Sequence, residues 1–196
     1  MIMEEYVIEI LTEEPSMEHF LRGILPKVLP DNYKIDVNCF IRTHRGKSDL
    51  KKSIPKKMRA YPQFGYPVKV LIIHDQDSND CKNLKNELIE LCGITTIPVV
   101  VRIACRELEN WYLGQMSAIE RVYPETKASS LVRKAKYRNP DLVHGADELN
   151  KMTSTTTIHQ VSTIPLMLSN SYVILKLKNQ WDVQQYITLI MTQIIS

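Results

Sequence analysis

A nearly unbroken apolar run at residues 68–74 (VKVLIIH) constrains the fold of this chain more than any other feature. A strand with one face in water alternates apolar and polar residues, whereas this run has a single polar interruption, Lys69. Such runs are typical of strands covered on both faces, which occur in parallel sheets whose crossover helices lie on both sides. The run therefore predicts an α/β protein.

The rest of the first half alternates between strand-like and helix-like patterns. Three further strands are expected at residues 6–11, 34–41 and 97–105. Helical spacing of apolar residues is seen at 13–29, 47–60 (a helix or helical loop interrupted by Pro55), 79–92 and 106–113. This order predicts a mainly parallel sheet of about four strands, flanked by helices and joined by right-handed crossovers.

Two parts of the chain differ in composition. Residues 1–114 carry the α/β pattern, whereas residues 115–196 are more polar and rich in turn signals, with a last helix expected at 181–194. We interpret the first part as the core and the second as a helical and loop extension packed on the same domain.

The composition is that of an ordinary globular protein, with 44% hydrophobic and 24% charged residues among 196. No stretch of eighteen apolar residues is present, and the acidic N-terminus lacks the features of a signal peptide, so a cytoplasmic protein is expected. The four cysteines are widely spaced, which favours reduced thiols over a zinc site. No Walker loop, GxSxG or GxGxxG motif occurs.

Positive charge is concentrated in residues 42–59, which hold eight Lys or Arg and one Asp. The segment sums to +7 in a chain of net charge +3, so the remainder carries −4. Such asymmetry favours an anionic partner, although a solvated helix face is the alternative. The candidate nucleic-acid-binding residues are Arg45, Lys47, Lys51, Lys52 and Lys56. Tyr61 and Phe64 follow, either to stack on bases or to pack.

Acidic residues follow three of the predicted strands. Glu9 and Glu13 lie near the end of the first, Asp75 and Asp77 leave the third, and Glu107 and Glu109 follow the fourth. Because parallel strands end at one edge, these acids are expected to converge, and their mutual repulsion would be relieved by Mg²⁺ or Mn²⁺. The alternative is that the Asp residues only favour a turn. On a helix, Glu107 and Glu109 point about 200° apart, so only one is expected to face the site.

Several motifs, in order along residues 5–114, resemble the Toprim fold of topoisomerases, primases and nucleases of the overcoming-lysogenization-defect class. The closest likeness is to an uncharacterised Toprim-like family often encoded beside an ATPase. The residues that carry it are VIEILTEEPSMEHFLRGILPKVL, GKSDLKKSIPKKMRAY, DQDSNDCKNLKNEL and RIACRELENWYL.

The resemblance implies a Toprim-like fold and Mg²⁺-dependent phosphodiester chemistry. It assigns acid–base work to Glu9, with Glu13 as the second catalytic candidate, and metal binding to Asp75, Asp77 and Glu109. Ile10 stands where the family has glycine, and the match ends after Leu113.

Two functions are carried forward. The first is a metal-dependent nuclease or nuclease subunit, acting on DNA or RNA with an ATPase partner in a defence-type system. The second is a non-catalytic subunit of the same fold that binds nucleic acid or docks on an ATPase. A homodimer is a further option for its assembly. A nucleotide-sugar transferase would also use a DxD motif, but the first-strand glutamate would then be unexplained.

Overall fold

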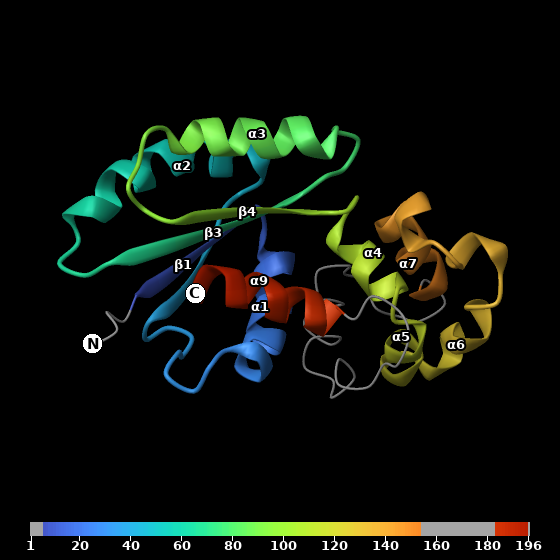
Figure 1. Ribbon diagram of the computed structural model, residues 1–196. Helices are drawn as coiled ribbons and strands as arrows, with labels where there is room; N and C mark the ends of the chain where they lie inside the picture. The colour runs from blue at the N-terminus through green and yellow to red at the C-terminus, as the bar shows by residue number, and fades with distance from the viewer. Residues whose placement is uncertain (1–5, 154–182, 196) are drawn as a thin grey trace.

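The computed structural model describes residues 6–153 and 183–195 and contains a four-stranded, all-parallel sheet in the order β2-β1-β3-β4 (Figure 1). The strands are β1 (Val7–Thr12), β2 (Cys39–Thr43), β3 (Val68–Asp75) and β4 (Val99–Ala104). Every residue of β3 is buried, as its apolar run predicts for a central strand. The predicted α/β class and parallel sheet are thus confirmed.

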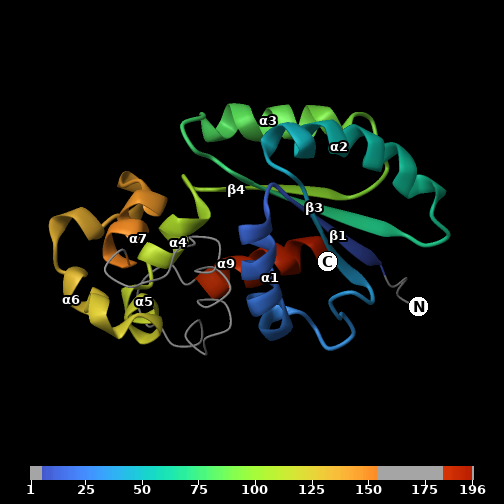
Figure 2. The same cartoon turned by 180° about the vertical axis from the view of Figure 1, so that it is seen from behind.

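The strand order explains which helix covers which face. The chain steps from β1 to its neighbour β2 in one direction, and then crosses back to β3 and on to β4 in the other. Right-handed crossovers therefore place α1 (Pro15–Val28) on one face, and α2 (Lys47–Ala60) and α3 (Cys81–Cys92) on the opposite face. Figure 2 shows the two layers from behind.

The expected strand at 34–41 is displaced, since β2 begins only at Cys39. The backbone N–H groups of Val37, Asn38 and Cys39 all donate to the carbonyl of Lys34, and Asp36 has a left-handed φ of 63°. These contacts form a turn, which the apolar residues of the segment did not reveal. The expected break at Pro55 is also absent, because Leu50, Ile54 and Met58 bury one continuous face of α2.

The last helix, α9 (Val183–Ile195), packs directly on the sheet. It packs on α1, β3 and β4, and its Ile187, Ile190, Met191 and Ile194 join the core cluster that contains Ile8 and Leu71. Since α1 is the single crossover helix on this face, α9 covers the part over β3 and β4. Helix α9 therefore completes the cover of this face of the sheet.

The remaining short helices gather beside the carboxyl ends of the strands (Figure 1). They are α4 (Leu108–Leu113), α5 (Met116–Val122), α6 (Ala128–Leu131) and α7 (Gly145–Thr153). Four 3₁₀ turns complete the described elements: η1 (Tyr61–Gln63), η2 (Pro124–Thr126), η3 (Ala135–Tyr137) and η4 (Pro140–Leu142). Within the described ranges, no helix has the length and apolar character needed to cross a membrane.

The central strand should be the most sensitive point of the core. Truncation of fully buried Ile72 to alanine is expected to lower the free energy of unfolding by about 2–5 kcal/mol, because it removes apolar contacts and leaves a cavity. Urea denaturation measures the loss. Leu189→Ala, at a side chain that is 55% exposed, is the control and should change the free energy of unfolding by under about 0.5 kcal/mol. Equal effects of the two substitutions would contradict this assignment of the core.

Candidate active site

The reversal of strand order creates a switch point between β1 and β3, where the chain leaves the two strands in opposite directions. Ligands of open α/β sheets bind in the crevice beyond the carboxyl ends of strands at such a point. Thr12 pairs with Ile73 in the register, and Asp75 pairs with Ala104 of β4. Glu13 and Asp75 therefore emerge side by side at the switch point.

Four carboxyl groups lie near one another at this edge, those of Glu13, Asp75, Asp77 and Glu109, and the charge of Glu14 acts on three of them. Burial, followed by the negative charges of Glu13 and Glu109, raises the pKa of Asp75 to about 8. Burial also raises the pKa of Glu13 to about 7, with Lys47 opposing the rise and Asp77 adding to it. The pKa of Glu109 is raised to about 7, again mainly by burial. The acids crowd together where water cannot fully screen them.

Two basic side chains touch the acids. The Lys47 ammonium, in the first turn of α2, forms an ion pair with Asp77. The Nδ1 atom of His74 lies 2.6 Å from the carbonyl oxygen of Asp75 and 3.1 Å from Oε2 of Glu13. Burial lowers the pKa of His74, which favours the neutral ring with a proton on Nδ1 that donates to the Asp75 carbonyl. Oε2 of Glu13 is left without a hydrogen-bond partner among the described residues. Of these two side chains, Lys47 is therefore the one that stays positively charged at neutral pH.

Several polar atoms at this edge are buried without a hydrogen-bond partner among the described residues. They include Oδ1 of Asp75, Nε2 of His74 and the hydroxyl of Tyr112. The pKa of Tyr112 is raised by burial and then by the charges of Glu109 and Asp75, which places its hydroxyl beside these acids. Tyr112 was not among the candidate site residues predicted from the sequence. Its position three residues after Glu109, on one face of α4, was the available signal.

The loops after β3 and β4 are fastened to each other. The N–H groups of Gln76 and Asp77 donate to the carbonyls of Ala104 (3.0 Å) and Arg106 (2.7 Å), and the Arg106 N–H donates to the Gln76 side chain (3.1 Å). Asp77 and Arg106 both adopt left-handed backbone conformations, with φ of 50° and 57°. Such conformations persist only where the surroundings fix them, and they cluster at functional sites.

Glu107 and Glu109 are separated as expected, but Glu107 is the extended N-cap residue of α4 and only Glu109 lies on the helix. The Oε2 atom of Glu107 accepts a hydrogen bond from the N–H of Ala146 at 3.2 Å, in the first turn of α7. Glu109 is buried and its charge acts on Asp75. Glu109 is therefore the acid of this pair that belongs to the cluster, while Glu107 joins α4 to α7.

Glu9 lies apart from the other acids. It pairs with Val70 in the register, five positions before Asp75, or about 16 Å along the strand. Its carboxylate is buried, accepts two hydrogen bonds of 2.8 Å from Arg42 and lies 3.2 Å from the Tyr61 hydroxyl. The expected convergence of Glu9 with the DxD acids is wrong, because Glu9 lies inside β1 and Glu13 follows its end.

The candidate nucleic-acid-binding residues divide into two groups. Arg45, Lys52 and Lys56 are exposed. Lys47 is paired with Asp77, and Lys51 with Glu87 of α3 at 2.7 Å. The basic segment therefore contributes both a surface and a cation within the acidic cluster.

Whether the acidic cluster can bind a divalent cation depends on which donor atoms it offers. The cluster offers carboxylate oxygens, which hard cations prefer, and Asp75 has an oxygen that the described residues leave unsatisfied. Within the described part of the chain, no three His, Cys, Asp or Glu side chains are arranged to hold a metal ion. The residue types fit Mg²⁺ or Mn²⁺, and a bound cation would compete with the Lys47 ammonium for Asp77.

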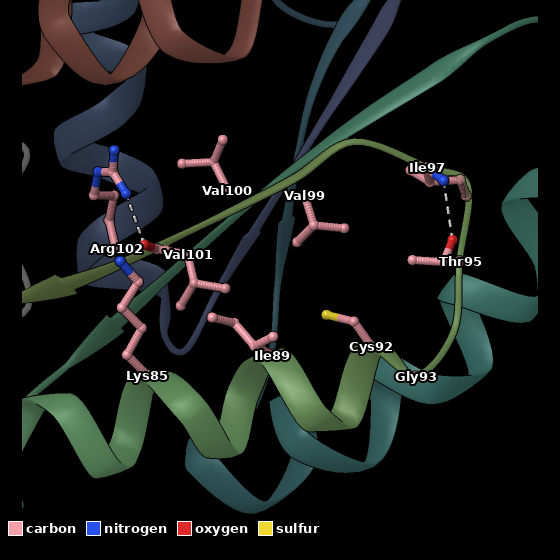
Figure 3. A pocket seen from close by; sticks show the side chains of 10 residues that line it. All are labelled: Lys85, Ile89, Cys92, Gly93, Thr95, Ile97, Val99, Val100, Val101 and Arg102. Carbon is pink, nitrogen blue, oxygen red and sulfur yellow. Dashed lines mark hydrogen bonds between the residues drawn. The ribbon is translucent and has the colours of Figure 1, made fainter.

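A groove elsewhere lies between α3 and the edge strand β4 (Figure 3). It has a volume of about 350 Å³, and its walls include Ile89, Val99 and Val101, with Lys85 and Arg102 among its polar residues. None of the clustered acids lines it, so it is separate from the candidate active site.

No family model, curated protein or solved structure matches this chain.

The raised pKa values predict how stability depends on pH without metal. Unfolded carboxyls titrate near pH 4, whereas Asp75, Glu13 and Glu109 titrate at about 7–8 in the folded protein. Between these values the folded form binds more protons, so the free energy of unfolding should fall as the pH rises from about 4 to about 8. Urea denaturation in EDTA across this range measures the slope.

The Asp75→Asn variant tests whether the clustered carboxyl groups cause this pH dependence. It removes the most strongly shifted group, so the slope should become shallower and the variant should be more stable than the wild type near pH 8. Glu90→Gln, at an exposed site of α3, should leave the slope unchanged. An Asp75→Asn slope equal to that of the wild type would mean that these carboxyls are not coupled as described.

Proposed function

We propose that this protein is a Toprim-like, divalent-metal-dependent nuclease or nuclease subunit that cleaves phosphodiester bonds in nucleic acid. The observation that carries the proposal is the meeting of Glu13, Asp75, Asp77 and Glu109 at the switch point, beside an exposed basic helix. An enzyme that cleaves a polyanion needs both a centre for a cation and a surface for phosphates. An ATPase partner and a defence setting enter through the motif resemblance alone.

The proposed roles follow from position. Asp75, Asp77 and Glu109 would hold the metal, which when bound supplies positive charge to stabilise the developing charge on the phosphate and lowers the pKa of water. Glu13 takes the acid–base role, because its pKa of about 7 lies near the operating pH of a general base. The ring of His74 lies beside Glu13, with Nδ1 at 3.1 Å from Oε2. Lys47, Arg45, Lys52 and Lys56 would contact phosphates.

Glu9 is given no chemical step in this proposal. Its carboxylate is satisfied by Arg42 and Tyr61, and it lies about 16 Å from the switch point. We assign it the structural task of fixing β2 and η1 against β1.

A non-catalytic nucleic-acid-binding or ATPase-docking subunit is the second candidate. The observation that favours it is the ion pair of Lys47 with Asp77, which satisfies a proposed metal ligand without any metal. In this alternative the acidic cluster is a structural remnant and the basic helix alone is functional.

Cleavage assays separate the two candidates. Purified protein is incubated with single-stranded and duplex DNA and RNA, with Mg²⁺, Mn²⁺ or EDTA. We expect metal-dependent cleavage that falls by about 10²–10⁴-fold in Glu13→Gln, because the acid–base group is lost, and that is abolished in Asp75→Asn. Glu90→Gln, at an exposed site of α3, is the control, and its rate per folded molecule should equal that of the wild type.

Cleavage that survives in both Glu13→Gln and Asp75→Asn would rule out this catalytic assignment. Tight nucleic-acid binding with no cleavage under any metal condition would instead favour the non-catalytic subunit.

The Lys47–Asp77 ion pair predicts competition between an ammonium group and a metal ion. Removing the ammonium in Lys47→Met should tighten Mn²⁺ binding by up to about fivefold, since a partly exposed ion pair contributes about 0.2–1 kcal/mol. Calorimetric titration measures the affinity. Lys52→Met, on the exposed face of the same helix, should leave it unchanged. Weaker Mn²⁺ binding in Lys47→Met would contradict the competition.

A further inference from the structure

A chain of three aromatic rings follows the C-terminal end of α2. The ring centroids of Tyr61 and Phe64 lie 5.4 Å apart, and those of Phe64 and Tyr66 also lie 5.4 Å apart. Tyr61 is buried and anchors the chain, whereas Phe64 and Tyr66 are 38% and 47% exposed. Two neighbouring aromatic side chains thus present part of their surface to solvent at the end of the sheet opposite the acidic cluster.

Positive charge lies near two of these rings, because Tyr61 and Tyr66 both act on the Arg42 guanidinium. The Arg42 guanidinium lies 4.7 Å from the ring centroid of Phe40, with its side chain 44% exposed while it binds Glu9. Lys57 is close enough for its pKa to be affected by both Glu9 and Arg42. Because Arg42 and Lys57 share one buried carboxylate, an excess of positive charge remains near Tyr66 at this end of the sheet. An aromatic surface with excess positive charge is complementary to nucleic acid, in which flat bases are attached to phosphates.

Helix α2 connects this surface to the acidic cluster. Lys47 in its first turn contacts Asp77, and its last residue, Ala60, directly precedes Tyr61. Its 14 residues span about 21 Å. Lys52, Lys56 and Arg59 lie on one exposed side of the helix, opposite the buried face, and no ion pair occupies them among the described residues.

We propose that Phe64 and Tyr66 form a stacking platform for the unpaired bases of a single-stranded nucleic acid, whose backbone follows the basic side of α2 towards the acidic edge. The platform deepens the proposed function by naming single strands as the substrate class, and its direction towards the acidic edge rests on that function. Bases in a duplex are already stacked on one another, so the platform discriminates against duplexes. Binding itself requires neither a metal nor cleavage.

Fluorescence anisotropy in EDTA tests the platform without catalysis. The probes are a short labelled oligothymidylate and a labelled duplex of the same length. We expect the wild type to bind the single strand more tightly, and Phe64→Ala and Tyr66→Ala each to weaken that binding by about fivefold or more, as expected for loss of one stacked base. Phe64→Trp, which enlarges the ring, should retain the affinity. Ile94→Ala, at a fully exposed apolar side chain, is the matched control and should bind like the wild type.

The salt dependence separates stacking from charge. The slope of the logarithm of affinity against that of salt concentration should be unchanged in Phe64→Ala and shallower by about one unit in Lys56→Met, which loses one phosphate contact. Equal losses for single strand and duplex in Phe64→Ala, or no loss for either, would overturn the platform.

This result and the proposed nuclease activity can fail separately. If stacking-dependent binding is found and Asp75→Asn cleaves like the wild type, the platform stands and the catalytic assignment fails. If Asp75→Asn abolishes cleavage but Phe64→Ala binds normally, the platform fails and the nuclease stands.

Discussion

The burial of like charges at the switch point between β1 and β3 is the constraint on which the other features of the site depend. The parallel sheet and its crossovers bring Glu13 and Asp75 to one edge, and α4 adds Glu109. Each acid is largely removed from water, so repulsion is met in three ways: protons held at raised pKa values, the Lys47 ammonium and backbone N–H donors. A protein that needed only a stable edge could place apolar residues there. In the proposed nuclease, this unfavourable arrangement would serve to bind a cation.

The fold could be predicted from sequence where one physical signal dominated. The apolar run of β3 and the regular spacing of α1 and α3 come from burial patterns that depend little on distant contacts. The predicted bounds of the second strand were wrong, because hydrogen bonds stabilise a turn at Lys34 and Asp36 and the apolar pattern does not encode them. The role of α9 could have been anticipated, since right-handed crossovers leave part of one sheet face for a later helix to cover.

The sequence placed Asp75, Asp77 and Glu13 at one edge of the sheet, where the structure also has them. The predicted position of Glu9 was wrong, and the cause was the misplaced second strand. Placing the second strand at 34–41 left Arg42 outside the sheet, so no partner for Glu9 was apparent. With β2 at Cys39–Thr43, Arg42 pairs with Leu11 in the register and its guanidinium reaches Glu9 two positions earlier on the adjacent strand. A shift of a few residues in one strand thus decides whether a buried glutamate is a free acid or is paired with an arginine. Contacts between distant segments, such as that of His74 with Glu13, likewise cannot be predicted until the register of the strands is known.

The two halves of the proposed interface are fixed by one rigid helix. Because α2 returns the chain from the carboxyl edge to the amino edge, its first turn contacts the acidic cluster and its last turn leads into the aromatic chain. Leu50, Ile54 and Met58 are buried along its length, so the distance between the two ends cannot vary without unpacking the core. The Glu9–Arg42 pair fixes the aromatic end in the same way, through the contact of Tyr61 with Glu9. An acid that performs no chemistry in this proposal would therefore still matter to substrate binding, because it positions the rings on which the bases would stack.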